Sequence, residues 1–229
     1  MSGAGNKELK ALYELRFEEK LLHKKSAVWN VLCKYFFGKW VSPKDTVVDV
    51  AAGYCEFINC VKAKKKYAFD LNPDVAKFSK MGRGGVNAVV ASCFDIGKYV
   101  GKEEVDVFFI SNFLEHLPDK DAVGDLFKEL VGLAKPGGRL LVLQPNIRLV
   151  GGAYWDFYDH KVALTEKSLA ELAQMNGLKV ELCIPRFLPY TMKSAFPQAP
   201  WVVWLYLKLM PFSGFVFGRQ SFMVFRKPE

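Results

Sequence analysis

Short β-rich runs alternate with longer helical segments from residue 46 to residue 146, and this alternation constrains the fold more than any other feature of the sequence. The candidate strands span residues 46–51, 66–71, 88–91, 105–110 and 139–144. The connections between them are long enough for crossover helices, which parallel strands require. Because 51% of the residues are hydrophobic, a disordered polymer is excluded. The pattern predicts an α/β fold with a doubly wound parallel sheet and helices on both faces.

The segment before this alternation predicts a helical cap. Two helical patterns, over residues 7–24 and 26–40, place leucines, valines and aromatics at helical spacing. They precede Pro43, which acts as a stop signal. We therefore expect residues 1–45 to form an N-terminal helical cap on the sheet.

The segment after it predicts the rest of a single domain. Thr165 and Gly177 bound a helix as capping and closing residues. Strands are expected near 179–184 and 220–226, which brings the sheet to seven strands with the last hairpin inserted antiparallel. Residues 46–146 would thus be the core and 147–229 the substrate loop, helix and final strands. A lid or wall is expected from residues 147–164 and 186–218.

Cysteine usage and the first residues indicate the compartment. The five cysteines form no CxxC pair, and an odd count argues against a disulfide scaffold. The segment MSGAGNKELK at the amino terminus has no apolar core of signal-peptide length. These features predict reduced thiols and a cytoplasmic location. The apolar region 201–217 is interrupted by Lys208 and Pro211, so it is not expected to cross a bilayer.

The net charge of +8 raises the question of nucleic-acid binding. The basic residues are spread over helical stretches, the run from Lys62 to Lys66 and an acid-poor tail after residue 183. We interpret them as a solvated or anion-attracting surface rather than a nucleic-acid footprint.

The junction after the first strand suits a ligand with a polar group. Its small residues Ala51, Ala52 and Gly53 permit a tight turn that presents backbone N–H groups and a helix start at the sheet edge. Asp70 closes the second strand 21 positions after Asp49 and is spaced to accept hydrogen bonds from ribose hydroxyls. The fingerprint GxGxxG is absent, which disfavours a dehydrogenase. Together the two elements indicate a nucleoside-containing ligand.

Three further segments complete a family pattern. They are SCFD at 92–95, SNFLEHLPD at 111–119 and KPGG at 135–138. With DxAxGxC at 49–55, they make the chain resemble a class I S-adenosylmethionine-dependent methyltransferase of the group with an LEHLPD-type segment after the fourth strand. The resemblance runs from about residue 46 to the end. It implies a Rossmann-like fold, S-adenosylmethionine as cofactor, and methyl transfer to an N, O or S atom of a small-molecule acceptor.

The resemblance also implies a set of cofactor-binding residues. The methionine end would be held by Asp49, Ala51 and Gly53, the ribose by Asp70, and the adenine by Leu71, Ser92, Cys93 and Phe94, with Ser111 and Asn112 under the sulfonium. The sequence departs from the common GxGxG pattern at Ala51 and Cys55. It has Ser92 where the family often has an acid for the adenine amino group.

The predicted catalytic residues are His116, His160 and Asp159. Methyl transfer is an in-line displacement, so a base is needed only when the acceptor carries a proton. The alternative for His116 is that Glu115 and His116 merely open a helix. The alternative for the loop before His160 is that its aromatics plug the sheet edge.

Substrate contacts are expected from two places. The predicted residues are Tyr154, Trp155, Asp156 and Tyr158 in the loop, and Tyr13, Arg16 and Phe17 in the first helix. Aromatic side chains suit a flat or cationic acceptor. Arg16 would pair with an anionic substrate group, or form a surface salt bridge with Glu19.

No metal is expected, because no second carboxylate-rich element or cysteine zinc pattern accompanies Asp156, Asp159 and His160.

Three rival functions stay open. A nucleic-acid methyltransferase is favoured by the basic charge and disfavoured because no proline-aromatic element follows the fourth strand. A non-catalytic cofactor-binding protein is the second. The third is a membrane-surface contact through 201–217, whose alternative is packing of that segment on the sheet. The sequence assigns no oligomeric state.

Overall fold

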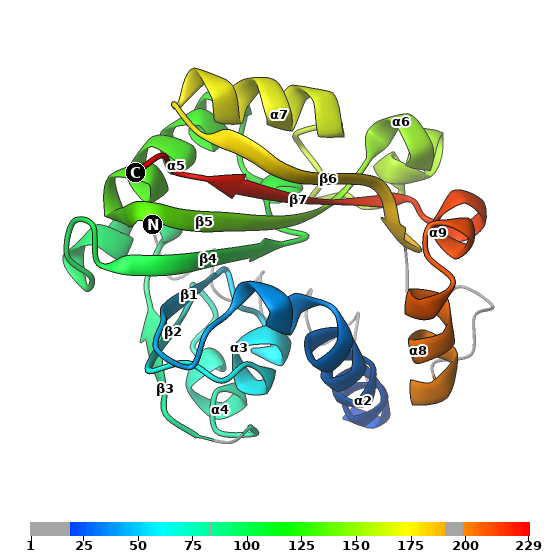
Figure 1. Cartoon of the computed structure of the whole chain (residues 1–229), viewed down its shortest axis with the longest axis horizontal. Coiled ribbons are helices and arrows are strands. Elements are labelled where there is room, and N and C mark those ends of the chain that lie inside the picture. Colours follow the sequence, from blue (N-terminus) through cyan, green and yellow to red (C-terminus); the bar gives the residue numbers. More distant parts are fainter. Residues whose placement is uncertain (1–18, 83, 191–198) are drawn as a thin grey trace.

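The computed structural model describes residues 19–82, 84–190 and 199–229, and its centre is a seven-stranded sheet in the order β3-β2-β1-β4-β5-β7-β6 (Figure 1). The strands are β1 (Thr46–Val50), β2 (Lys65–Asp70), β3 (Val86–Val90), β4 (Val105–Ser111), β5 (Ala134–Pro145), β6 (Lys179–Leu188) and β7 (Gln220–Arg226). The first five are parallel, and β7 pairs antiparallel with both β5 and β6. The predicted fold class is confirmed, including the antiparallel last strand.

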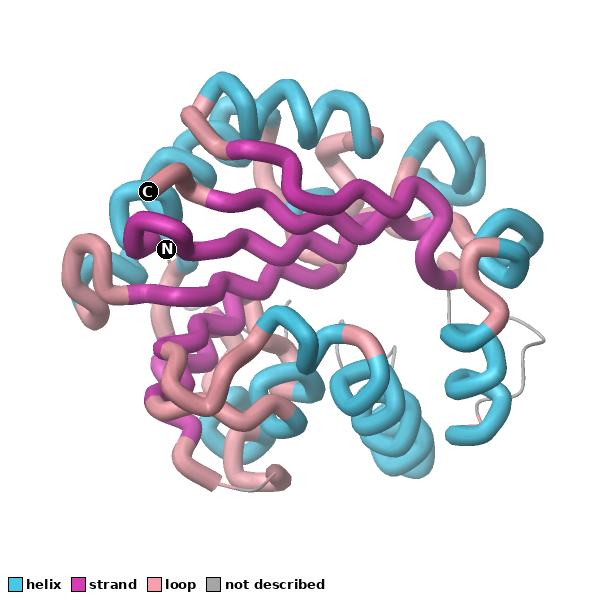
Figure 2. Tube along the Cα trace, viewed as in Figure 1, coloured by secondary structure: helices cyan, strands magenta, loops and turns pink. Residues whose placement is uncertain are grey.

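Helices cover both faces of the twisted sheet that Figure 2 shows. One face carries α2 (Glu19–Tyr35), α3 (Glu56–Cys60) and α4 (Val75–Phe78), and the other carries η2 (Cys93–Lys98), α5 (Lys120–Leu133) and α7 (Glu166–Met175). Alternate residues of a strand serve opposite layers, since Val47 packs in the α2 layer and Val48 in the α5 layer. This two-sided burial explains why the parallel strands read as continuous apolar runs.

The amino-terminal helices differ from the prediction. The expected boundary between residues 24 and 26 does not exist, because α2 runs through it from Glu19 to Tyr35. No proline or glycine lies there to stop the helix. The helix ends before Gly38, where an added Cβ would meet the carbonyl oxygen of Cys33 at 2.6 Å. A short 3-10 turn, η1 (Phe37–Trp40), follows.

The KPGG segment also differs from the prediction. It precedes the predicted strand 139–144, but it lies within β5 and forms a bulge there: Ala134 pairs with Val105, and the register resumes where Arg139 pairs with Val107. Gly137 permits this with a positive φ of 74°.

The carboxyl-terminal part follows the prediction closely. Thr165 caps α7 through the backbone N–H of Ser168, and Gly177 follows the helix with a φ of 74°. Two further helices, α8 (Pro200–Lys208) and α9 (Phe212–Phe217), lie between β6 and β7 in the chain, and α8 lies beside α2 (Figure 1). Within the described ranges, every helix falls short of the length and apolar character that a membrane crossing requires.

Candidate active site

The turn after β1 is built by backbone geometry. Ala51, Gly53 and Cys55 all have positive φ angles, of 53°, 52° and 58°. Two of them are not glycine, so the turn holds strain of the kind that gathers at functional sites. The N–H of Gly53 donates to Asp70 Oδ2 at 2.7 Å, which ties the turn to the end of β2. Small residues at this bend leave the carboxyl edge of the sheet open to a ligand.

Asp70 organises this edge. Its Oδ1 accepts from the N–H of Asn72 at 2.8 Å, while Oδ2 accepts from Gly53. Burial raises the pKa of Asp70, and the backbone N–H groups of Asn72 and Gly53 oppose that rise. A carboxylate has about four acceptor sites, so Asp70 can accept a further hydrogen bond besides those from the backbone, and its predicted contact with ribose stays a prediction.

The residues after β2 and β3 supply an apolar, partly exposed wall. Leu71 and Phe94 are 38% and 42% exposed, which is unusual for large apolar side chains beside a sheet edge. Ser92 Oγ accepts from the N–H of Phe94 at 3.3 Å, and Cys93 is buried behind them. Exposed apolar side chains beside a carboxylate that can accept ribose hydroxyls fit an adenosyl group.

Ser111 and Asn112 end the fourth strand at the same edge. Asn112 has a positive φ of 49° and donates its backbone N–H to the carbonyl of Leu143 at 2.8 Å. Its Nδ2 lies 3.3 Å from Ser111 Oγ, and Asn112 is exposed. Asparagine tolerates this backbone region better than most residues, so the chain can turn here while keeping a polar side chain at the edge.

Asp49 lies behind the turn rather than in it, with 4% of its surface exposed. Burial raises its pKa strongly, and the charges of Glu56 and Asp70 add to the rise, whereas a hydrogen bond from the backbone of Ile58 opposes it. Its predicted contact with the cofactor's ammonium group stays a prediction, and the bond to Ile58 gives it a structural role at the start of α3.

The predicted catalytic residues come together. His116, in η3 (Leu114–His116), places Nδ1 at 3.2 Å from Asp159 Oδ2 and at 3.2 Å from the carbonyl oxygen of Asp159. His160 lies against the same ring, with centroids 5.1 Å apart in an edge-on arrangement. The N–H groups of Lys161 and Val162 donate to the carbonyl of Glu115, which fixes the two segments side by side.

The surroundings set the protonation of His116. Burial lowers its pKa, but the hydrogen bond to Asp159 and the negative charges of Glu115 and Asp159 outweigh that effect, so its pKa lies above the ordinary histidine value. When Nδ1 donates to Asp159, Nε2 is the basic nitrogen.

Aromatic side chains of the loop 154–160 pack against His160. The ring of His160 stacks on Phe157 at 5.0 Å and tilts against Tyr154 at 4.7 Å. Tyr154 is fully buried, and its hydroxyl donates to the carbonyl of Val162. The ring of Tyr154 therefore lies inside the loop against the imidazole of His160, and its predicted contact with an acceptor stays a prediction.

The other predicted substrate residues divide into two groups. Trp155, Asp156 and Tyr158 lie on the surface of the loop, with Tyr158 98% exposed. They are accessible to an acceptor. Tyr13, Arg16 and Phe17 lie outside the described residues.

Sequence reasoning missed Glu115 and Gln144 as site residues. Glu115 is 1% exposed and accepts from Gln144 Nε2 at 3.0 Å. Burial raises the pKa of Glu115, with the charge of His116 opposing the rise. The available signal was a glutamine at the end of an otherwise apolar fifth strand, where a polar side chain needs a buried partner.

One ligand atom each from Glu115, His116 and His160 lies within 4.8 Å of the others, an arrangement that could hold a metal ion. These are not the three residues that the sequence raised as candidate ligands, since His160 alone is shared. The expectation that no metal takes part stays a prediction.

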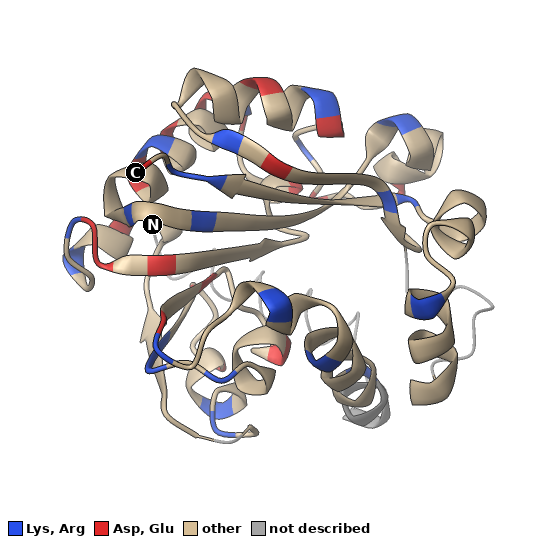
Figure 3. Cartoon of the chain, in the orientation of Figure 1, with Lys and Arg blue, Asp and Glu red and all other residues tan. Residues whose placement is uncertain are grey.

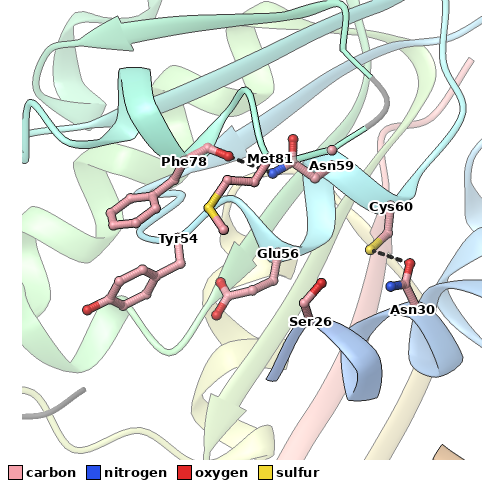
Figure 4. A pocket seen from close by; sticks show the side chains of 9 residues that line it. Ser26, Asn30, Tyr54, Glu56, Asn59, Cys60, Phe78 and Met81 are labelled. Carbon is pink, nitrogen blue, oxygen red and sulfur yellow. Dashed lines mark hydrogen bonds between the residues drawn. The ribbon is translucent and has the colours of Figure 1, made fainter. Parts of the chain in front are cut away.

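A separate pocket of about 230 Å³ lies between α2, α3 and α4 (Figure 4). Its lining includes Asn30, Tyr54, Glu56, Asn59 and Phe78. None of the predicted cofactor-binding residues lines it. The predicted cofactor site lies at the strand ends instead, where Asp70 Oδ2 meets the positive-φ turn at Gly53, and it stays a prediction.

Comparison with known proteins agrees with the fold. Residues 48–142 match the family model described as a methyltransferase domain. No curated protein matches the chain. The matched segment covers the strands that carry Asp70, Asn112 and His116.

Several solved structures are similar over most of the chain. A S-adenosylmethionine-dependent methyltransferase from Archaeoglobus fulgidus is 19% identical, with a TM-score of 0.61, covering 92% of this chain and 100% of that one. A 1,6-didemethyltoxoflavin-N1-methyltransferase from Burkholderia thailandensis, with bound S-adenosylhomocysteine, is 16% identical, with a TM-score of 0.58, covering 97% and 86%. The Haloferax volcanii complex of the Trm112 methyltransferase activator and a putative methyltransferase gives 16% identity and a TM-score of 0.65, covering 88% and 90%.

Proposed function

We propose that this chain, a class I S-adenosylmethionine-dependent methyltransferase, transfers a methyl group to an N, O or S atom of a small-molecule acceptor, with His116 as general base. The observation that carries the proposal is the pair of His116, which follows β4, and Asp159, which lies in the loop before α7. His116 thus stands in the segment after one of the strand ends expected to hold the cofactor. Bound S-adenosylmethionine supplies an electrophilic methyl group on a sulfonium. The turn at 51–53 and Asp70 would hold its polar parts, and Leu71 and Phe94 its adenine.

The protein's own part in the reaction is positioning and proton transfer. His116 Nε2 would accept the proton of the acceptor's hydroxyl, amine or thiol, while Asp159 holds Nδ1 and stabilises the imidazolium. His160, fixed by its contact with Phe157, would orient the acceptor beside His116. Glu115 lies beside His116, and its charge together with that of Asp159 raises the pKa of the imidazole.

A small-molecule acceptor is supported by charge and by the loop. Many of the basic residues are paired with acids, as in the contacts Lys65–Glu104, Lys135–Asp106 and Arg139–Glu181. Figure 3 shows blue and red residues interspersed over many elements. Among the described residues, such pairing interrupts the basic surface and disfavours the continuous basic stripe that binds a nucleic-acid backbone. Exposed Trp155 and Tyr158 offer rings for stacking or cation–π contact. A cytoplasmic location belongs to the same proposal.

The experiment that tests the proposal uses labelled cofactor and a fractionated metabolite extract. Mass detection of a one-methyl gain, lost in a His116→Ala variant that still binds the cofactor, would support both activity and base. Calorimetric uptake of cofactor with no methylated product from any fraction would favour the non-catalytic rival. Methylated RNA or DNA would favour the nucleic-acid rival.

A further inference from the structure

The strongest unexplained feature is a set of exposed apolar side chains on α8 and α9, here called the α8–α9 surface. Its members, with exposed fractions, are Trp201 68%, Trp204 39%, Leu205 40%, Leu209 52%, Phe212 77%, Phe215 73% and Val216 56%. Soluble surfaces seldom gather so many large apolar side chains in one short segment. None of them is among the predicted cofactor-binding or catalytic residues.

The exposed residues of α8 follow helical spacing. Trp201, Trp204, Leu205 and Leu209 are related by steps of three and four, so they share the outward face. On the opposite face Tyr206 is buried, and Val203 and Leu207 pack against the core. A helix that is apolar on its outer as well as its inner face requires a second apolar environment.

Hydrogen bonds and one close backbone contact attach α8 and α9 to β6 and to each other. Tyr206 Oη donates to the carbonyl of Phe187 at 2.7 Å, which anchors α8 to β6. An added Cβ at Gly214 would meet the carbonyl oxygen of Arg186 at 2.2 Å, so α9 packs backbone to backbone on the same strand. Ser213 Oγ donates to the carbonyl of Tyr206 at 2.7 Å and joins the two helices. These contacts fix the orientation of both helices, so the exposed apolar side chains face solvent in the folded chain.

Basic side chains accompany the apolar ones. The ammonium of Lys208 lies 5.9 Å from the ring centroid of Trp204, and the guanidinium of Arg186 lies 5.5 Å from that of Phe215. Arg219 follows directly after α9. The sequence contains no Asp or Glu from residue 182 to residue 228, and Figure 3 shows no red on α8 or α9.

From this combination we propose that the α8–α9 surface docks on an anionic lipid bilayer, with its aromatic side chains at the headgroup level and Lys208, Arg186 and Arg219 toward lipid phosphates. Tryptophan and basic residues are the side chains favoured at that depth. The helices lie on the surface and do not span it, since α8 has only nine residues. A second copy of the chain fits less well, because a self-complementary interface would bring the same acid-free, basic surfaces together.

The test is co-sedimentation of the full chain with phosphatidylcholine vesicles that contain about one-third phosphatidylserine, compared with pure phosphatidylcholine. We expect binding to the anionic vesicles that weakens as salt is raised. The double variant Trp201→Ser/Phe212→Ser should bind at least about tenfold more weakly. The matched control Tyr35→Ser/Met175→Ser removes exposed side chains of similar size from α2 and α7, at 43% and 79% exposure, and should bind like the parent.

A charge variant tests the lipid preference separately. Lys208→Gln should reduce binding to the anionic vesicles about fivefold, the equivalent of about 1 kcal/mol for one basic residue at such a surface. Docking does not depend on methyl transfer, so each variant is also tested for cofactor uptake, which should be unchanged.

Three results would overturn the proposal. One is no sedimentation with either vesicle, and another is an equal loss in the control double variant. The third is a stable dimer in equilibrium sedimentation that Trp201→Ser/Phe212→Ser dissociates, which would assign the surface to a second copy of the chain.

Discussion

His116 Nδ1 lies 3.2 Å from Asp159 Oδ2, although 43 residues separate them in the chain. The contact joins the segment after β4 to the loop before α7. Backbone hydrogen bonds from Lys161 and Val162 to the carbonyl of Glu115 hold the two segments in register. An imidazole held this way is oriented before any acceptor arrives.

If His116 is the base, His116→Ala should lower turnover by about 10²- to 10⁴-fold for an acceptor that must lose a proton. Cofactor affinity should stay at the parental level, because His116 is not among the residues that would hold the adenosyl group. Steady-state rates and calorimetry measure the two effects. Lys128→Ala, at an exposed pair with Asp125 on α5, is the control. Parental turnover in His116→Ala would remove the base assignment.

The pH profile tests the partnership with Asp159. A base must be neutral to accept a proton, so activity should rise with pH as His116 deprotonates, with a midpoint above the ordinary value of about 6.5. Asp159→Asn removes the charge and weakens the hydrogen bond that raise this pKa, so the rising limb should move to lower pH. An unchanged limb in Asp159→Asn would show that another group controls the profile.

Asp70→Ala should weaken cofactor binding by at least about tenfold, because ribose would lose charge-assisted hydrogen bonds. The same change leaves the N–H groups of Gly53 and Asn72 without their acceptor, so unfolding free energy should fall by about 1–3 kcal/mol. Calorimetry and denaturant unfolding measure the two quantities. Asp125→Ala, distant on α5, should change neither. Parental affinity in a folded Asp70→Ala protein would exclude Asp70 from the site.

Glu115 gives a stability prediction with a definite sign. Its folded-state pKa is raised above 4.5 by burial, so its contribution to stability is complete at low pH and is lost as pH rises through the folded value. The glutamine in Glu115→Gln cannot ionise. The unfolding free energy of this variant should therefore fall less than that of the parent between about pH 5 and about pH 8. Urea titrations at the two pH values give the difference. Identical losses in parent and variant would mean that Glu115 does not titrate in this range.

Two glycines offer a matched test of packing. Gly214→Ala would drive a Cβ into the carbonyl of Arg186 and should cost about 1–3 kcal/mol of stability. Gly132→Ala, in α5, meets nothing within 4 Å and should stabilise by up to about 1 kcal/mol, because alanine favours helix. Thermal unfolding separates the two. A neutral Gly214→Ala would mean that α9 can lift from β6.

The sequence by itself determined the sheet, because strand and helix periodicities and the capping residues Thr165 and Gly177 are local signals. It also marked the strand ends that carry Asp70, Asn112 and His116, since parallel strands present their carboxyl ends at one edge. The break predicted near residue 25 was wrong, because α2 passes through it and no proline or glycine stands there to end a helix.

Only the tertiary structure shows which side chains of distant segments contact one another and which are buried. Tyr154 and Tyr158 are four residues apart in one aromatic loop, yet the first is fully buried and the second is 98% exposed. The burial of Glu115 against Gln144 and the outward apolar face of α8 likewise depend on which segments meet in space. Residue type sets what a side chain can do, whereas its burial, its pKa and its neighbours arise from contacts that the folded chain alone creates.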